Sequence, residues 1–152
     1  ARTTRRSGSA NRSWTGTSAS ASYNPGMLGG FVAVGVGAAL GAWLRWGLAT
    51  WLNPRVPTFP LGTLAANLVG GYLVGVAVAY FAARHSLPHE ARLFAITGFL
   101  GALTTFSTFS AEVVELLARG DYAAGGLLAF THLAGSLLLT VAGFATFRAL
   151  TA

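Results

Sequence analysis

The chain has 152 residues, of which 53% are hydrophobic and only 9% are charged. Soluble domains carry roughly 25% charged residues, so the composition excludes an ordinary soluble domain and indicates an integral membrane protein. The absence of cysteine excludes disulfides and thiolate metal sites. The formal charge of +6 resembles a nucleic-acid signal, but from Met27 onward six Arg face four acidic residues, a net of only +2. No nucleic-acid partner is therefore expected.

Residues 1–26 are rich in Ser, Thr, Arg and Asn and have no apolar period, which predicts a disordered tail. Met27, the single methionine, stands directly before the first apolar run. We interpret the tail as foreign to the protein or as the product of a mis-assigned upstream start. A targeting segment is the alternative, since transit peptides are Arg- and Ser-rich. Residues 27–152 are expected to form one domain.

Four apolar segments follow, at residues 28–51, 61–83, about 93–117 and 122–147. Each exceeds the ~20 residues that a helix needs to cross a bilayer core. All five prolines lie outside these runs, as helix ends and loops require. The predicted fold class is an all-α membrane protein with four transmembrane helices.

The arginines do not favour one orientation. With the N-terminus inside and the tail set aside, one side receives Arg84, Arg92 and Arg148, and the other receives Arg55, Arg119 and Arg45. The positive-inside rule then has nothing to act on, so the chain could insert both ways and pair with itself antiparallel. With the Arg-rich tail included, the bias becomes N-inside.

Polar residues inside the spans need a partner or a water-filled path. Thr63 and Asn67 share one helical face, and His132, Ser136 and Thr140 form a second stripe at four-residue steps. A lone Ser or Thr is satisfied most simply by its own helix carbonyl, but an amide such as Asn67 is not. For His132 an interhelical hydrogen bond is favoured over a gate or a proton-carrying group. The pairs Gly37/Gly41 and Gly71/Gly75 are G-x-x-x-G packing signals.

The stretch "GFLGALTTFSTFS" (98–110) combines glycines, threonines and serines in mid-span. Gly98, Gly101, Thr104 and Thr105 weaken a helix, which predicts a break in the third span. Carbonyls exposed by such a break must be satisfied by protein or by a bound ion, and they would suit a hard cation such as Na⁺.

After the predicted break, Phe106 and Phe109 share a helical face, with Ser107, Thr108 and Ser110 alongside. Aromatic rings have a positive edge, and hydroxyls are donors. These groups offer a small anion a path without a full positive charge that would trap it. The alternative is that both rings merely pack against neighbouring helices.

Three segments, "GFLGALTTFSTFSAE", "GTLAANLVGGYLVG" and "GAALGAWLRW", resemble the Fluc/CrcB fluoride channels. The similarity covers essentially Met27 to the C-terminus. It implies a passive, fluoride-selective channel in the bacterial inner membrane that exports fluoride from the cytoplasm. The implied assembly is a dual-topology antiparallel homodimer with two pores, in which the carbonyls of Gly101 and Thr104 from both chains hold a structural Na⁺. The family often has Gly-Gly in the break, where this chain has Gly101-Ala102.

The resemblance also implies a fluoride pathway lined by ring edges, one amide and several hydroxyls. Its residues are Phe106, Phe109, Asn67, Thr63, Ser107, Thr108, Ser110, Ser136 and Glu112. Asn67 would donate to fluoride and orient the rings. Glu112 would lie near a pore mouth, and Arg45 would lie at a vestibule where its field concentrates anions. His132 has no role in this pattern, but its stripe suggests a position beside the pore.

Three other functions remain as alternatives. A small proton-coupled multidrug exporter would need a membrane-embedded Glu in the first helix, and residues 28–51 contain none. A proton- or Na⁺-coupled fluoride carrier would differ from a channel only in flux stoichiometry. In a non-conducting scaffold the hydroxyls would only hold helices together. An enzyme is not expected, because the sequence offers no Ser/His/Asp set or carboxylate pair in a plausible soluble pocket.

Overall fold

The computed structural model describes residues 25–56, 59–84 and 86–152. The predicted tail therefore lies outside the described residues, apart from Pro25 and Gly26, which begin the first helix. The described chain is helical, with elements α1 (Pro25–Leu52), η1 (Asn53–Arg55), α2 (Leu61–Ala83), α3 (His89–Arg92), η2 (Leu93–Leu100), α4 (Gly101–Leu103), α5 (Phe106–Ala118) and α6 (Tyr122–Thr151).

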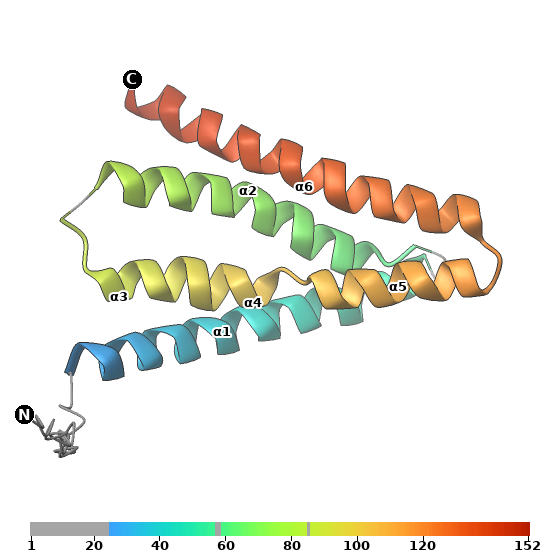
Figure 1. The fold of residues 1–152 in the computed structure, drawn as a ribbon, viewed down its shortest axis with the longest axis horizontal. Helices are drawn as coiled ribbons and strands as arrows, with labels where there is room; N and C mark the ends of the chain where they lie inside the picture. Colours follow the sequence, from blue (N-terminus) through green and yellow to red (C-terminus); the bar gives the residue numbers. More distant parts are fainter. Residues whose placement is uncertain (1–24, 57–58, 85) are drawn as a thin grey trace, which may run out of the picture.

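The prediction of four membrane-spanning segments is confirmed. The described residues contain four helical stretches long and apolar enough to cross a membrane, Gly26–Arg55, Leu61–Ala83, His89–Ala118 and Tyr122–Thr151. The second has the predicted bounds, and the others extend beyond theirs by one or more residues at an end. Successive spans run antiparallel, so that α1 begins and α6 ends at the same end of the molecule (Figure 1).

Glycines allow two pairs of spans to pack closely. α1 packs mainly against η2, and α2 packs mainly against α6. A Cβ at Gly41 would overlap the carbonyl oxygen of Phe99, and a Cβ at Gly75 would overlap that of Thr140. Both G-x-x-x-G pairs therefore serve as packing positions, as the sequence indicates.

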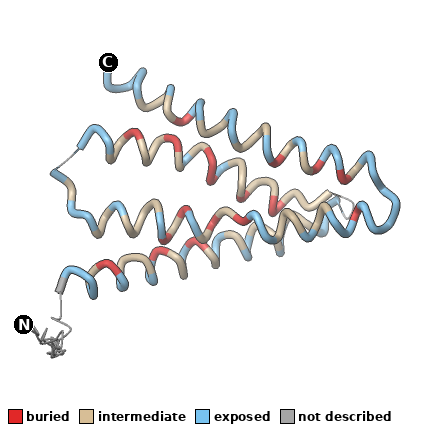
Figure 2. Tube along the Cα trace, in the orientation of Figure 1, coloured by how far each residue is buried: buried red, intermediate tan, exposed pale blue. Residues whose placement is uncertain are grey.

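The buried residues lie where spans face one another, and the outer faces are exposed (Figure 2). Ala66, Leu100 and Leu103 form a small buried cluster at the crossing of α2 with the third span. Large apolar side chains on the outside, such as Trp43 and Leu138, are 68% and 70% exposed. Apolar surface of this kind suits contact with lipid or with another membrane-embedded chain.

The third span is irregular over two stretches. Leu93–Leu100 has a wide π-helical turn, in which the amide of Gly101 donates to the Ile96 carbonyl five residues earlier. After α4, Thr104 (φ −79°, ψ 152°) and Thr105 (φ −148°, ψ 118°) are extended, and α5 begins at Phe106. Thr105 caps α5, because its hydroxyl accepts a hydrogen bond from the Thr108 amide at 3.1 Å.

Candidate functional site

The extended segment between α4 and α5 is held by Asn67 of α2. The Thr105 amide donates to Asn67 Oδ1 at 2.7 Å, and Asn67 Nδ2 donates to the Thr105 carbonyl at 3.0 Å. One side-chain amide thus pairs with both backbone groups of a residue that has left the helical ladder. This pairing satisfies polar backbone that a membrane interior would otherwise leave without partners.

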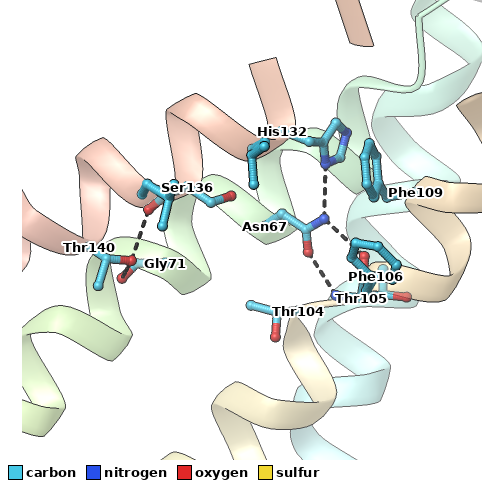
Figure 3. A pocket seen from close by; sticks show the side chains of 11 residues that line it. Asn67, Gly71, Thr104, Thr105, Phe106, Phe109, His132, Ser136 and Thr140 are labelled. Carbon is cyan, nitrogen blue, oxygen red and sulfur yellow. Dashed lines mark hydrogen bonds between the residues drawn. The ribbon is translucent and has the colours of Figure 1, made fainter. Parts of the chain in front are cut away.

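His132 of α6 joins the same group of side chains (Figure 3). Its Nδ1 lies 3.0 Å from Asn67 Nδ2, within hydrogen-bonding distance. Its ring stacks on Phe109, with centroids 4.6 Å apart and an interplanar angle of 26°. Phe109 in turn makes an edge-to-face contact with Phe106, with centroids 5.4 Å apart. The interhelical hydrogen bond favoured for His132 from the sequence is present.

These side chains border a cavity of about 290 Å³. It is lined by Asn67, Gly71, Thr104, Thr105, Phe106, Phe109, His132, Leu133, Ser136, Leu137 and Thr140. Four predicted pathway residues, Asn67, Phe106, Phe109 and Ser136, therefore share one cavity. The Thr140 hydroxyl, also on its lining, shares its single hydrogen between the Gly71 carbonyl at 3.0 Å and the Ser136 carbonyl at 2.8 Å.

A second cavity, of about 390 Å³, contains other predicted residues. Thr63, Thr108 and Arg45 line it together with Ala42, Trp43, Trp46, Ala49 and Thr105. Because Thr105 lines both cavities, the extended segment stands between them. Arg45 does not simply face this space, since its Nε donates to the Ala102 carbonyl at 2.9 Å.

Glu112 is tied to α2 rather than free. Thr63 Oγ1 donates to Glu112 Oε1 at 2.6 Å, while Oε2 is buried and has no hydrogen-bond partner in the described part of the chain. Thr63 itself is 2% exposed. Glu112 lies outside the residues that line the two cavities.

Two predicted hydroxyl residues also lie outside the linings of both cavities. Ser110 donates to the Phe106 carbonyl of its own helix at 2.8 Å. Ser107 lies on an exposed position, with its hydroxyl 3.2 Å from that of Thr105. For Ser110 the local back-bond is the observed arrangement.

The extended segment also diverts the donors of two helical carbonyls. In a continuous helix the Thr105 amide would donate to the Gly101 carbonyl and the Thr108 amide to the Thr104 carbonyl. Here those amides donate to Asn67 Oδ1 and to the Thr105 hydroxyl instead. Gly101 is exposed in the single chain, so its backbone is accessible from outside the bundle.

Sequence reasoning gave no site role to Thr105, which organises this region through its backbone and its hydroxyl. Its signal was the N-cap preference of threonine directly before the helical pattern that starts at Phe106. His132 and Thr140 were recognised as members of one stripe, but neither was assigned to the pathway. Their contacts with α2 depend on how α6 is rotated against it.

These features define a multi-pass membrane protein with a cavity, lined by polar, aromatic and aliphatic residues, beside an extended segment of its third span. A family model described as CrcB-like protein, Camphor Resistance (CrcB), matches residues 32–144. The chain belongs to this family.

Curated relatives cover most of the chain. A protein of Thiobacillus denitrificans is 64% identical over 114 residues, which are 75% of this chain and 92% of the relative. Proteins of Nitrosospira multiformis and Cupriavidus necator are each 64% identical, over 76% and 80% of this chain and 91% and 96% of their own lengths. All three relatives carry the name fluoride-specific ion channel FluC.

Proposed function

We propose that the protein is a passive, fluoride-selective channel that lets a bacterial cell lose fluoride from its cytoplasm. The observation that carries this function is the cavity where Asn67, Phe106, Phe109 and Ser136 meet, in a chain whose close relatives are named fluoride-specific channels. The chain is a transport protein and not an enzyme.

The physical reason lies in how fluoride is dehydrated. A small anion holds water tightly, so a pathway must offer closely spaced partners along its length. The Phe106 and Phe109 edges and the Ser136 hydroxyl provide positive partial charge. The residues lining this cavity carry no Arg, so no full positive charge there would trap the ion. We propose that the enclosed path is too tight for a larger anion such as chloride.

We propose that the working unit is an antiparallel homodimer formed by chains inserted in both orientations. Phe106 supports this assembly, because a residue expected to line a pore is 78% exposed in the single chain. A second copy would cover that ring and close the cavity on its open side. Counted along the sequence from Met27, three Arg residues fall on each side of the membrane, which removes the bias against mixed insertion.

Support for a structural Na⁺ comes from two carbonyls of the third span. The Gly101 and Thr104 carbonyls have lost their helical donors to Asn67 and Thr105, and hard cations prefer oxygen ligands. We propose that these carbonyls from two copies hold the ion, which neutralises their partial charge at the dimer interface. The carbonyl of the intervening Ala102 accepts from Arg45, so it is not among the carbonyls proposed for the ion.

Arg45 supports the proposed vestibule through its position beside the second cavity. Arg45 lines that cavity together with Thr63 and Thr108, so the guanidinium that bonds to Ala102 also contributes a positive field where an anion would enter.

We propose the bacterial inner membrane as the location of the channel.

The rival transporters have less support. α1 carries no acidic residue, whereas a proton-coupled multidrug exporter of this size needs one in its first helix. Glu112 does not replace that residue, because it lies in the third span and its carboxylate accepts a hydrogen bond from Thr63. A coupled fluoride carrier would share the pathway and would differ from a channel in flux stoichiometry.

Fluoride efflux from liposomes tests the proposed function. The purified protein is reconstituted with internal fluoride or chloride, and K⁺ permeability is supplied by an ionophore. We expect rapid fluoride efflux that requires the ionophore and no chloride release. Fluoride retention by verified, folded dimers would contradict the channel, and ionophore-independent efflux would indicate a coupled carrier.

A further inference from the structure

The Asn67 side-chain amide has one possible orientation in this structure. The Thr105 amide can only donate and the Thr105 carbonyl can only accept, and they lie 2.7 Å from Oδ1 and 3.0 Å from Nδ2. Exchanging the oxygen and nitrogen of Asn67 would place donor against donor and acceptor against acceptor. The backbone of Thr105 therefore fixes which end of Asn67 carries the hydrogens.

That orientation also fixes the proton position on His132. An amide NH₂ group has two hydrogens and donates only. One hydrogen goes to the Thr105 carbonyl, and the other points to His132 Nδ1 at 3.0 Å. Nδ1 must then be an unprotonated acceptor, so a neutral ring carries its proton on Nε2. Nε2 is buried and has no hydrogen-bond partner in the part of the chain that the structure describes, so no contact there opposes this tautomer.

The consequence for Asn67 is that its side-chain oxygen and both of its amide hydrogens are already engaged in hydrogen bonds. Its oxygen accepts from Thr105, and its two hydrogens go to Thr105 and His132. Asn67 is therefore a clamp between the extended segment and α6 in this conformation, and has no free hydrogen to offer an anion. The role of fluoride donor implied for Asn67 requires one of these bonds to open.

His132 contacts both of the groups that matter for the pathway. Through Nδ1 it holds Asn67, and through its ring face it holds Phe109, which contacts Phe106 edge to face. The side chain is 3% exposed and comes from a helix separate from the other two. The single His132 ring thus supplies both the acceptor nitrogen for Asn67 and the flat face for Phe109.

We propose that His132 is a positioning residue, locked as the neutral tautomer with its proton on Nε2. In this form it orders the Asn67 amide and the Phe109 ring from α6. Its importance for transport rests on the proposed fluoride function, whereas the tautomer does not.

Nitrogen NMR of the histidine ring tests the tautomer directly. The full chain is labelled with ¹⁵N-histidine and carries His85→Gln and His89→Gln, so that His132 alone is observed. The chemical shifts of the two ring nitrogens at neutral pH report which one carries the proton. We expect the proton on Nε2. A proton on Nδ1 would overturn the proposal, whether or not the protein transports fluoride.

The substitution Asn67→Asp tests what sets the tautomer. A carboxylate only accepts, so it would draw a proton onto Nδ1, and the His132 signals should change to those of a protonated Nδ1. An unchanged Nε2–H tautomer in the folded variant would show that Asn67 does not control the ring.

Two variants of His132 itself test the positioning role, and they do so even if Asn67→Asp does not fold. His132→Phe keeps a ring against Phe109 but removes the acceptor, and His132→Gln keeps an acceptor but removes the stack. We expect each to lower fluoride efflux by roughly tenfold, since a buried donor or ring loses its partner, and His132→Ala to lower it further. Parent-like efflux from all three folded variants would reduce His132 to a packing residue.

Discussion

At the scale of single residues, the site depends on which polar groups form hydrogen bonds with each other. Asn67 and Thr105 make two hydrogen bonds that replace lost helical bonds, and buried polar groups in a membrane need such replacement. Phe106 differs from them, because it is 78% exposed and contacts the site through Phe109. Its exposed ring has room to meet an ion or a second chain.

Phe106→Ile should reduce fluoride efflux by at least about tenfold, which corresponds to about 1.4 kcal/mol. Isoleucine keeps apolar bulk but has no positive ring edge to face an anion. Initial efflux rates from liposomes at matched protein density measure the effect. Phe130→Ile is the control, since Phe130 is 68% exposed on α6 and lies outside the linings of both cavities. Parent-like efflux with a destabilised protein would favour the non-conducting scaffold.

At the scale of helices, close packing positions the site. α2 presents Asn67 to the third span while its glycine face packs on α6, and α1 packs on η2 just before the extended segment. A shift of α2 against α6 would separate Asn67 from His132, and a shift of α1 against the third span would separate Arg45 from Ala102. Small residues allow this close approach where lipid gives no hydrophobic drive for helices to associate.

Gly41→Val should lower the free energy of unfolding by about 1–3 kcal/mol, the usual cost of overpacking. The new side chain would overlap the Phe99 carbonyl oxygen in the neighbouring span. Thermal unfolding in detergent, followed by circular dichroism, measures the loss. Gly35→Val is the matched control on the same helix, where a Cβ meets nothing within 4 Å. Equal melting temperatures for the two variants would be evidence against the close contact.

At the scale of the whole molecule, one chain leaves the proposed pathway incomplete. Its exposed apolar side chains include Phe106, Leu133 and Leu137, the last two of which are 65% and 61% exposed beside the cavity. A partner that covers these residues would turn an open cavity into an enclosed path. An antiparallel copy would bring the Gly101 and Thr104 carbonyls of both chains together.

Dual insertion predicts that each end of the fold is found on both sides of the membrane. The chain has no cysteine, so Asp121→Cys and Ser86→Cys each supply one thiol, on the α5–α6 and α2–α3 connections. In intact cells an impermeant thiol reagent should label roughly half of each variant, because the residues from Met27 onward carry no orienting charge bias. Full labelling of one variant with none of the other would establish a single orientation. The comparison is made on the chain that starts at Met27, since the preceding Arg residues favour N-inside insertion.

The sequence by itself determined the four spans, the glycine packing positions and four of the eleven residues that line the first cavity. Apolar runs of sufficient length and four-residue polar stripes are local properties, so they require no knowledge of neighbouring helices. The motif around Phe106 and Phe109 indicated the family, which the comparisons confirm.

Only the tertiary structure decided how these residues are connected. The pairing of Asn67 with Thr105 and His132, the bond from Arg45 to Ala102 and the bond from Thr63 to Glu112 join residues at least 38 positions apart. Such contacts depend on the rotation and depth of each helix against its neighbours, and helical periodicity specifies neither. The same reason explains why Ser110 carried a site prediction while Thr105 did not, since both are hydroxyl residues of one stretch and differ in what lies opposite them.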